Sequence, residues 1–316
     1  MRRLYVSSGI PHTKIVKLLG KLQLEDDVAA AIDVTINTLT RSLVPLYEEL
    51  CVTEILHLKS GAPFAWTCVS FSAMLRHVAR ESKGFRDILR SLWQARPSTE
   101  DRPYHVVLYG DEVVPGNVLR LDNKRKAFCI YATIRELGPN LIKDESCRFP
   151  LAVFLTTIAK GTEVGTSHAF RVMLTRMLLT EKIGSDGVCI DLAVPGTRFA
   201  TLYFALGNIV ADGDALRSIW SSNGAAGKLP CILCKNVVND VLPSAYLVGI
   251  SCTDCGRFDT ATDRDIWQKA DDLHAQFAAT GQNRDFNQLQ MMYGITYSPE
   301  GLLWDRALRD VAITCK

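Results

Sequence analysis

Short strand-like runs and one strong helical stretch alternate along the middle of the chain, and their order most constrains the fold. Three apolar runs come first, a helical stretch follows at 167–184, and two further runs come next. The helical stretch begins at Ser167, carries an apolar stripe at helical spacing and ends at Gly184. Because strands, a helix, more strands and then helices follow one another, we expect an α/β fold with a mixed sheet flanked by helices. The strand-like runs are 105–113, 127–137, 149–158, 188–194 and 199–210.

Residues 1–98 predict a helical N-terminal region. Apolar residues recur at helical spacing over 26–50 and over 71–95, and Gly84 interrupts the second stretch. We interpret the region as a helical packing platform rather than a DNA-binding element. The polar, proline-flanked segment 95–103 marks a boundary. The predicted domains are this region, a core of 99–222 and 259–316, and a Cys-rich insertion at 223–258.

The composition is that of an ordinary globular protein. Of 316 residues, 47% are hydrophobic and 22% are charged, and the net charge is +2, so no overall charge points to nucleic acid or to a membrane. No run of 18 apolar residues predicts a spanning helix, and the first residues do not resemble a secretory signal. We therefore expect an intracellular protein whose ten cysteines are buried thiols or metal ligands.

Four cysteines are spaced like the ligands of a structural zinc site. Cys231 and Cys234 form one C-x2-C pair, Cys252 and Cys255 form another, and 17 residues (235–251) separate them. Each pair can place two thiolates on one side of a tight turn, and two pairs complete a tetrahedron around Zn²⁺. Alternatively, all four are unligated core thiols, or only the first pair binds metal because the second follows a strand-like apolar segment.

Two carboxylates follow apolar strand-like runs. Asp111 comes at the end of the run at 105–113, and Asp212 directly follows the run at 199–210. Two carboxylates at the ends of neighbouring strands repel each other, and a shared Mg²⁺ would relieve the repulsion, for which we expect a separation of about 6 Å. The alternative is that Asp212 caps the helix running to Trp220.

Other titratable residues give weaker signals. Glu112, Asp191 and Asp214 fit either the metal or the capping role. His105 and His168 are interpreted as core histidines. A basic stretch between two strand-like runs offers phosphate contacts for nucleic acid, or is simply a solvated hairpin tip. Its residues are Arg120, Lys124, Arg125 and Lys126.

Two segments together resemble a known family. The segment D-x-D-A-L-x-x-I-W…G-x-x-G-K-L-P-C-x-L-C-K-N, over 212–236, resembles the catalytic core of CACTA-type (En/Spm, Plavaka-like) DNA transposases. The segment Y-G-D-E-V-V-P-G-N-V-L-R…K-R-K-A-F-C-I-Y, over 109–131, is similar to that family's first acidic strand and hairpin. The resemblance covers about 104–304. It implies a ribonuclease-H-like core, a nuclear DNA-acting enzyme of transposable-element origin that performs DNA recombination, and Mg²⁺ or Mn²⁺ held by Asp111 and Asp212.

The C-terminal end departs from the family pattern. The resemblance implies a third acidic residue in a D-x-M-H-like motif, and no such motif occurs here. Glu300, Asp305 and Asp310 are the only acidic residues in 297–316, which we interpret as a truncated or altered end. We therefore expect phosphoryl transfer on DNA to be impaired. One alternative function is a non-catalytic nucleic-acid- or protein-binding module with a structural zinc. Another is an unrelated α/β enzyme stabilised by zinc, but no known nucleotide-binding motif in the sequence supports it.

Overall fold

A computed structural model describes residues 49–113, 126–144, 147–194, 196–239 and 255–309. The chain divides into two compact units, 1–51 and 52–316, and the fold below is that of the second unit. The helix expected over 26–50 lies almost entirely outside the described residues. No described helix is both long enough and apolar enough to cross a lipid bilayer.

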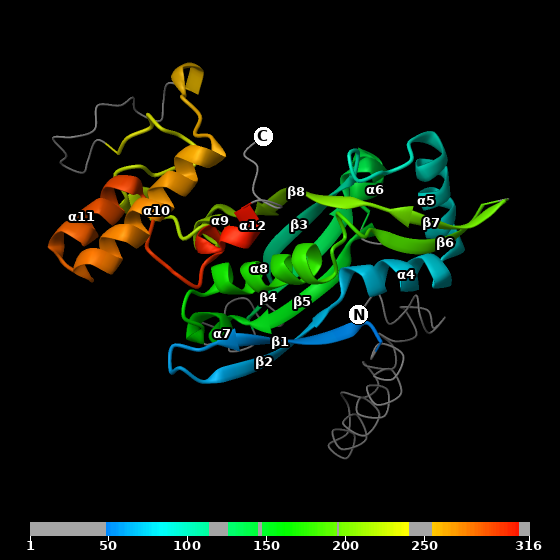
Figure 1. Cartoon of the computed structure of the whole chain (residues 1–316), viewed down its shortest axis with the longest axis horizontal. Helices are drawn as coiled ribbons and strands as arrows, with labels where there is room; N and C mark the ends of the chain where they lie inside the picture. The colour runs from blue at the N-terminus through cyan, green and yellow to red at the C-terminus, as the bar shows by residue number, and fades with distance from the viewer. Residues whose placement is uncertain (1–48, 114–125, 145–146, 195, 240–254, 310–316) are drawn as a thin grey trace, which may run out of the picture. The chain divides into compact units, whose positions relative to one another are not determined.

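A four-stranded mixed sheet forms the centre of the second unit (Figure 1). Its strands lie in the order β5-β4-β3-β8, with β3 antiparallel to β4, β4 antiparallel to β5, and β3 parallel to β8. The expectation of an α/β fold with a mixed sheet flanked by helices is therefore confirmed. The strands are β3 (Tyr104–Val113), β4 (Ala127–Ile134), β5 (Phe149–Leu155) and β8 (Phe204–Ala211).

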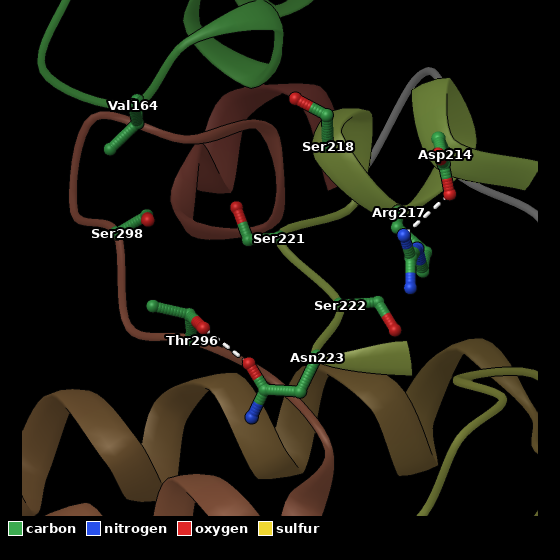
Figure 2. A pocket seen from close by; sticks show the side chains of 9 residues that line it. All are labelled: Val164, Asp214, Arg217, Ser218, Ser221, Ser222, Asn223, Thr296 and Ser298. Atoms are coloured by element: carbon green, nitrogen blue, oxygen red, sulfur yellow. Dashed lines mark hydrogen bonds and ion pairs between the residues drawn. The ribbon is translucent and has the colours of Figure 1, made fainter. Parts of the chain in front are cut away.

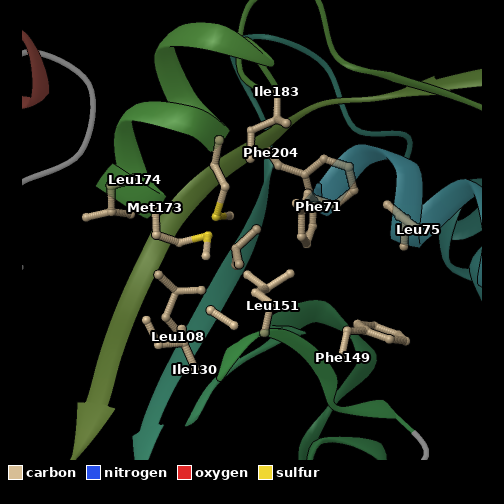
Figure 3. Close-up of a cluster of buried hydrophobic side chains, with 14 of the residues drawn as sticks. Phe71, Leu75, Leu108, Ile130, Phe149, Leu151, Met173, Leu174, Ile183 and Phe204 are labelled. Carbon is tan, nitrogen blue, oxygen red and sulfur yellow. The ribbon is translucent and has the colours of Figure 1, made fainter. Parts of the chain in front are cut away.

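Helix α8 (Thr166–Leu174) supplies apolar side chains to one face of this sheet, and Figure 3 shows Met173 and Leu174 beside Leu108 and Ile130. The contact is close at Gly110 of β3. A Cβ atom there would lie 2.8 Å from a ring carbon of Phe128 and 3.2 Å from one of Phe170. Glycine at this position therefore lets the aromatic rings of α8 and β4 reach the backbone of β3.

Two hairpins and two helices complete the core. Strand β1 (Cys51–His57) pairs with β2 (Pro63–Val69), and β6 (Val188–Val194) pairs with β7 (Thr197–Leu202). The β1–β2 hairpin corrects our expectation that residues up to 95 are mostly helical. Trp66 of β2 and Phe154 of β5 make an edge-to-face contact, with ring centroids 5.5 Å apart, so the hairpin adds to the same core.

Helices α4 (Phe71–Glu81) and α5 (Lys83–Ala95) occupy the stretch predicted to be helical, and the break falls at Ser82, two residues before Gly84. The Ser82 hydroxyl accepts a hydrogen bond from the Phe85 backbone and so caps α5. The same residue, Ser82, is also the C-cap of α4. Phe71 and Leu75 of α4 are buried in the core that contains the sheet.

The run at 199–210, predicted as one strand, forms two. Strand β7 ends at Leu202 and β8 begins at Phe204, and the two belong to different sheets. The Tyr203 carbonyl between them accepts a hydrogen bond from the Tyr104 backbone at 2.8 Å, while the Tyr203 amide donates to Ser98 at 3.0 Å. Both backbone groups of Tyr203 are thus satisfied where the chain leaves one sheet for the other.

A second apolar cluster joins the C-terminal helices α10 (Asp263–Thr280) and α11 (Arg284–Tyr293). Leu273, Phe286 and Leu303 are buried in it. The remaining helical elements are α6 (Pro139–Ile142), α7 (Thr156–Gly161), α9 (Gly213–Ile219), α12 (Arg306–Arg309), a π-helical continuation of α8 (Thr175–Thr180), and 3₁₀ turns at Arg135–Leu137, Gly224–Ala226, Cys255–Arg257 and Leu302–Trp304.

The close contact at Gly110 predicts a large cost for one added methyl group. We expect Gly110→Ala to lower the free energy of unfolding by about 1–3 kcal/mol, because buried aromatic rings must move. The matched control is Gly84→Ala in α5, where an added Cβ meets nothing within 4 Å; it should stabilise the protein by about 0.5–1 kcal/mol. Urea unfolding of both variants measures the difference, and equal midpoints would contradict the contact.

Candidate metal centres

The parallel pairing of β3 with β8 brings Asp111 and Asp212 to one end of the sheet. Gly110 pairs with Ala211 in this register; Asp111 is the next residue of β3, and Asp212 directly follows the last residue of β8. Neighbouring strands lie about 4.8 Å apart, and paired residues of parallel strands point to the same face. Both aspartates are exposed. The register therefore brings two aspartates that are separated by about 100 residues of sequence close together at the point where β8 ends.

Asp212 uses one carboxylate oxygen locally. Its Oδ1 atom accepts a hydrogen bond from the Ala215 backbone at 2.6 Å, and Asp212 is the N-cap of α9. The capping role anticipated for this residue is therefore present. A carboxylate has two oxygens and about four acceptor sites, so the cap leaves the second oxygen for a cation.

Asp111 and Glu112 are adjacent in sequence and differ in their surroundings. Within the described residues the Asp111 side chain has no hydrogen bond and no ion pair. Glu112, by contrast, lies 2.8 Å from Lys126 Nζ and accepts from the Thr156 hydroxyl at 3.3 Å. Glu112 is thus already neutralised, whereas the charge of Asp111 has no counterpart in this part of the chain.

The predicted basic stretch is described only at its last residue. Arg120, Lys124 and Arg125 lie outside the described residues, and Lys126 directly precedes β4. Because Lys126 pairs with Glu112, part of its charge is used within the protein. Its side chain is 45% exposed, so the ammonium group remains within reach of solvent.

The remaining acidic candidates have partners of their own. Asp214 pairs with Arg217, Glu300 lies 2.6 Å from Arg171, and Asp305 accepts from the Leu308 backbone at 3.2 Å. Asp191 accepts from the Ala193 backbone at 2.9 Å, and Asp310 lies outside the described ranges. Over the described parts of the chain, no group of three or more His, Cys, Asp or Glu side chains could hold a metal ion.

The first cysteine pair forms a tight turn that is partly buried. The Cys234 backbone donates to the Cys231 carbonyl at 3.3 Å, and the Cys234 side chain is buried. Burial raises the pKa of the Cys234 thiol to about 11, and a hydrogen bond with Cys231 adds to the effect. At neutral pH the Cys234 thiol is therefore protonated in the metal-free protein, so binding a metal there would release a proton.

The chain returns beside this turn just after the second cysteine pair. The backbone amide of Lys235 donates to the Asp259 carbonyl, and that of Ala261 donates to the Leu233 carbonyl, both at 2.8 Å. Cys234 and Thr260 form an antiparallel β-bridge. Cys252 lies outside the described residues, and of Cys255 the structure describes only the backbone, at the start of a 3₁₀ turn. The backbone thus closes a loop whose two ends carry the two pairs.

Lys269 on α10 was not anticipated from the sequence. Burial lowers its pKa, its ammonium nitrogen is buried, and that nitrogen has no hydrogen-bond acceptor among the described residues. Cys231 and Asp265 are the negative or ionisable groups that raise its pKa. No sequence signal links residues 38 positions apart (231 and 269); only the packing of α10 beside the cysteine turn does.

His168 is a core histidine, as expected, whereas His105 is not. His168 is fully buried; its Nε2 atom accepts from the His57 backbone at 3.3 Å, and Nδ1 lies 3.2 Å from the Glu300 carbonyl. These contacts require a proton on Nδ1 and none on Nε2. His105 is half-buried, with Nδ1 2.7 Å from a carboxylate oxygen of Glu136.

Neither a protein-family model nor a curated protein sequence matches this chain. Its site residues therefore have to be interpreted from their own chemistry and geometry.

The surroundings of His168 predict a loss of stability in acid. Burial is the main cause that lowers its pKa below 6.5, so the unfolded chain takes up this proton at higher pH than the folded protein does. The contribution is complete above about pH 6.5 and falls as the pH drops toward the folded pKa, by at most about 1.4 kcal/mol per pH unit. In addition, protonation of Nε2 removes the acceptor for the His57 backbone.

We expect His168→Gln to flatten the pH dependence of the unfolding free energy below pH 6.5, measured by urea unfolding. His274→Gln is the control, because His274 is exposed and should leave the slope unchanged. A His168→Gln profile parallel to that of the unsubstituted protein would contradict this account.

Proposed function

We propose that the chain is a transposase-derived DNA-acting protein with a ribonuclease-H-like core, in which metal-dependent phosphoryl transfer is impaired. The observation that carries the proposal is the register of β3 and β8, because it brings Asp111 and Asp212 close together where β8 ends. Three antiparallel strands, a helix and a fourth strand parallel to the first give these residues their common edge. The resemblance over 104–304 supplies the reaction class.

The residues present fit a divalent cation of the magnesium type. Asp111 is exposed and unpaired in the described part of the chain, and Asp212 retains an oxygen beyond its helix cap. Hard cations such as Mg²⁺ and Mn²⁺ take oxygen ligands of this kind. When bound, the metal would activate a water or a DNA 3′-hydroxyl and stabilise the leaving oxygen. Asp111 and Asp212 would hold the cation, and the hydrogen bond of the helix cap restrains the Asp212 carboxylate.

Impairment follows from the shortage of carboxylates. Glu300 and Asp305, two of the acidic residues near the end of the described chain, are engaged with Arg171 and with the Leu308 backbone. Two carboxylates provide fewer ligands than the three that the resemblance implies. A metal held by two would bind weakly and would be poorly positioned for in-line displacement.

A structural zinc at the cysteine-rich insertion belongs to the same proposal. Cys231 and Cys234 lie in one turn, and the hydrogen bonds from Lys235 and Ala261 bring the chain after Cys255 back beside it. We propose Cys252 and Cys255 as the other two ligands. A closed four-thiolate site would stabilise the insertion without taking part in chemistry.

The second candidate function is a non-catalytic nucleic-acid-binding module on the same fold. It is favoured by the pairing of Glu112 with Lys126, which removes an acidic residue from the strand end. Arg120, Lys124, Arg125 and Lys126 would then contact phosphates and Asp111 would be dispensable. Salt-dependent DNA binding that survives Asp111→Ala favours this function. The nucleus is the proposed location in either case.

The carboxylate pair predicts metal-dependent stability. Saturating Mn²⁺ should raise the melting temperature, since a ligand at 100 times its Kd adds about 2.7 kcal/mol. Asp111→Asn should abolish the shift and, without metal, should melt at the same or a higher temperature because repulsion of Asp212 is removed. Asp101→Asn, at an exposed residue outside the strand ends, is the control and should keep the shift.

Plasmid nicking with Mn²⁺ then separates the two candidate functions. Weak nicking that Asp111→Asn lowers by about 100-fold supports catalysis. Mn²⁺ stabilisation without nicking supports a binding module. If Mn²⁺ still raises the melting temperature of the Asp111→Asn variant, the proposed carboxylate site is wrong.

The cysteine turn predicts about one zinc ion per chain by mass spectrometry of the purified protein. Cys231→Ser should lose the metal and a large part of the stability of the insertion, because structural zinc binding contributes folding free energy. Cys189→Ser, at an exposed cysteine of β6, is the control and should retain zinc. Zinc retained by Cys231→Ser, or absent from the unsubstituted protein, would remove this part of the proposal.

A further inference from the structure

A polar pocket of about 430 Å³ lies at the C-terminal end of α9, the helix that Asp212 caps (Figure 2). Its lining is dominated by hydroxyl and amide groups and includes one cation, Arg217, and one carboxylate, Asp214. The pocket is open to solvent. Other residues of its lining are Ser218, Ser221, Asn223, Thr296 and Ser298.

Hydrogen bonds between distant segments fix the walls of this pocket. The Ser218 hydroxyl lies 2.9 Å from that of Thr166 at the start of α8, and the Thr296 backbone donates to the Ser221 carbonyl at 2.8 Å. The Thr296 hydroxyl also bonds the Asn223 side chain, as Figure 2 shows. The pocket is therefore preformed, which lowers the entropic cost of binding.

Two hydroxyls in the lining have no protein partner. Neither the Ser221 nor the Ser298 side chain makes a hydrogen bond within the described residues. Ser221 also has a φ of 52°, a conformation that costs a non-glycine residue free energy. Because the Ser221 hydroxyl has no hydrogen-bond partner in the described part of the chain, it is available to a ligand.

Arg217 lies along the pocket wall over Gly224. The φ of Gly224 is 53°, a backbone conformation that favours glycine, and a Cβ atom there would lie 2.3 Å from Cδ of Arg217, so the flexible arginine side chain would have to shift. The guanidinium pairs with Asp214, which is 88% exposed, while Arg217 itself is 45% exposed. Solvent weakens so exposed a pair, and guanidinium donors remain for an anion in the pocket.

We propose that this pocket binds the phosphodiester backbone of the DNA strand next to the reacting phosphate, an inference that rests on the proposed function. Arginine, serine, threonine and asparagine side chains are the usual partners of DNA phosphates. Six residues of helix, from Asp212 to Ser218, span about 9 Å. That is the axial rise of two or three nucleotides of a duplex strand, about 3.4 Å each. One strand can therefore reach both the carboxylate pair and the pocket.

The test measures binding of the full-length chain to a fluorescent DNA duplex with a single-stranded 3′ end, over a range of salt concentrations and without divalent metal. The double variant Asp214→Asn/Arg217→Met removes the cation without leaving an unpaired carboxylate. It should bind about tenfold more weakly, and its salt dependence should fall by about one released ion. The control Arg264→Met, at an exposed residue of α10 outside the pocket, should change neither value.

A second variant gives a result of opposite sign. Asp214→Asn alone removes a carboxylate that repels phosphate and competes for Arg217, so it should bind DNA more tightly than the unsubstituted chain. Because Asp214 is 88% exposed, this change does not endanger folding. Equal or weaker binding by Asp214→Asn would overturn the inference.

The outcomes separate this inference from the proposed function. If the unsubstituted chain binds no DNA even at low salt, the proposed function fails and the pocket assignment fails with it. If it binds DNA and the double variant matches it in affinity and salt dependence, only the pocket assignment is overturned. Competition with millimolar inorganic phosphate gives a third outcome. If phosphate displaces the DNA from the unsubstituted chain but not from the double variant, the pocket is a site for free phosphate, and the assignment to a DNA strand is overturned.

Discussion

The parallel pairing of β3 with β8 is the constraint on which the rest of the structure depends. Parallel strands cannot be joined by a tight turn, so the chain between them crosses the sheet through α8. Phe170 of α8 fits against β3 because residue 110 is glycine. The same register determines which residues meet at the strand ends. Core packing and the position of the acidic pair are therefore two consequences of one strand alignment.

Charge at that strand end is unevenly distributed. Glu112 is neutralised by Lys126, Asp212 is bonded to the backbone of α9, and Asp111 has no partner within the described residues. An acidic side chain without a counter-charge gains most from a cation. Helix α9 begins at this end of the sheet, where Asp212 caps it, and its residues Asp214, Arg217 and Ser218 line the polar pocket.

Much of the fold was predictable because its signals are local. Apolar runs predicted the strands of the central sheet, and an apolar stripe predicted α8, although its helical continuation ends at Thr180 and not at Gly184 as expected. The β1–β2 hairpin was missed because its residue types do not follow its alternating burial: Ile55 is exposed, whereas Glu54 is half-buried. In addition, Trp66 contacts Phe154 of a distant strand. The run at 199–210 gave no sign of its division at Tyr203, since the break depends on hydrogen bonds to Tyr104 and Ser98.

By itself, the sequence determined the residue types: carboxylates after apolar runs, thiols at zinc-like spacing, and a helix start that Asp212 could cap. Only the tertiary structure decided which of these residues meet. It brought Asp111 and Asp212 close together where β8 ends, formed an ion pair between Glu112 and Lys126, and placed Lys269 beside the Cys231 turn. The physical reason is that a strand or helix forms from neighbouring residues, whereas strand register and helix packing depend on contacts between residues far apart in the chain.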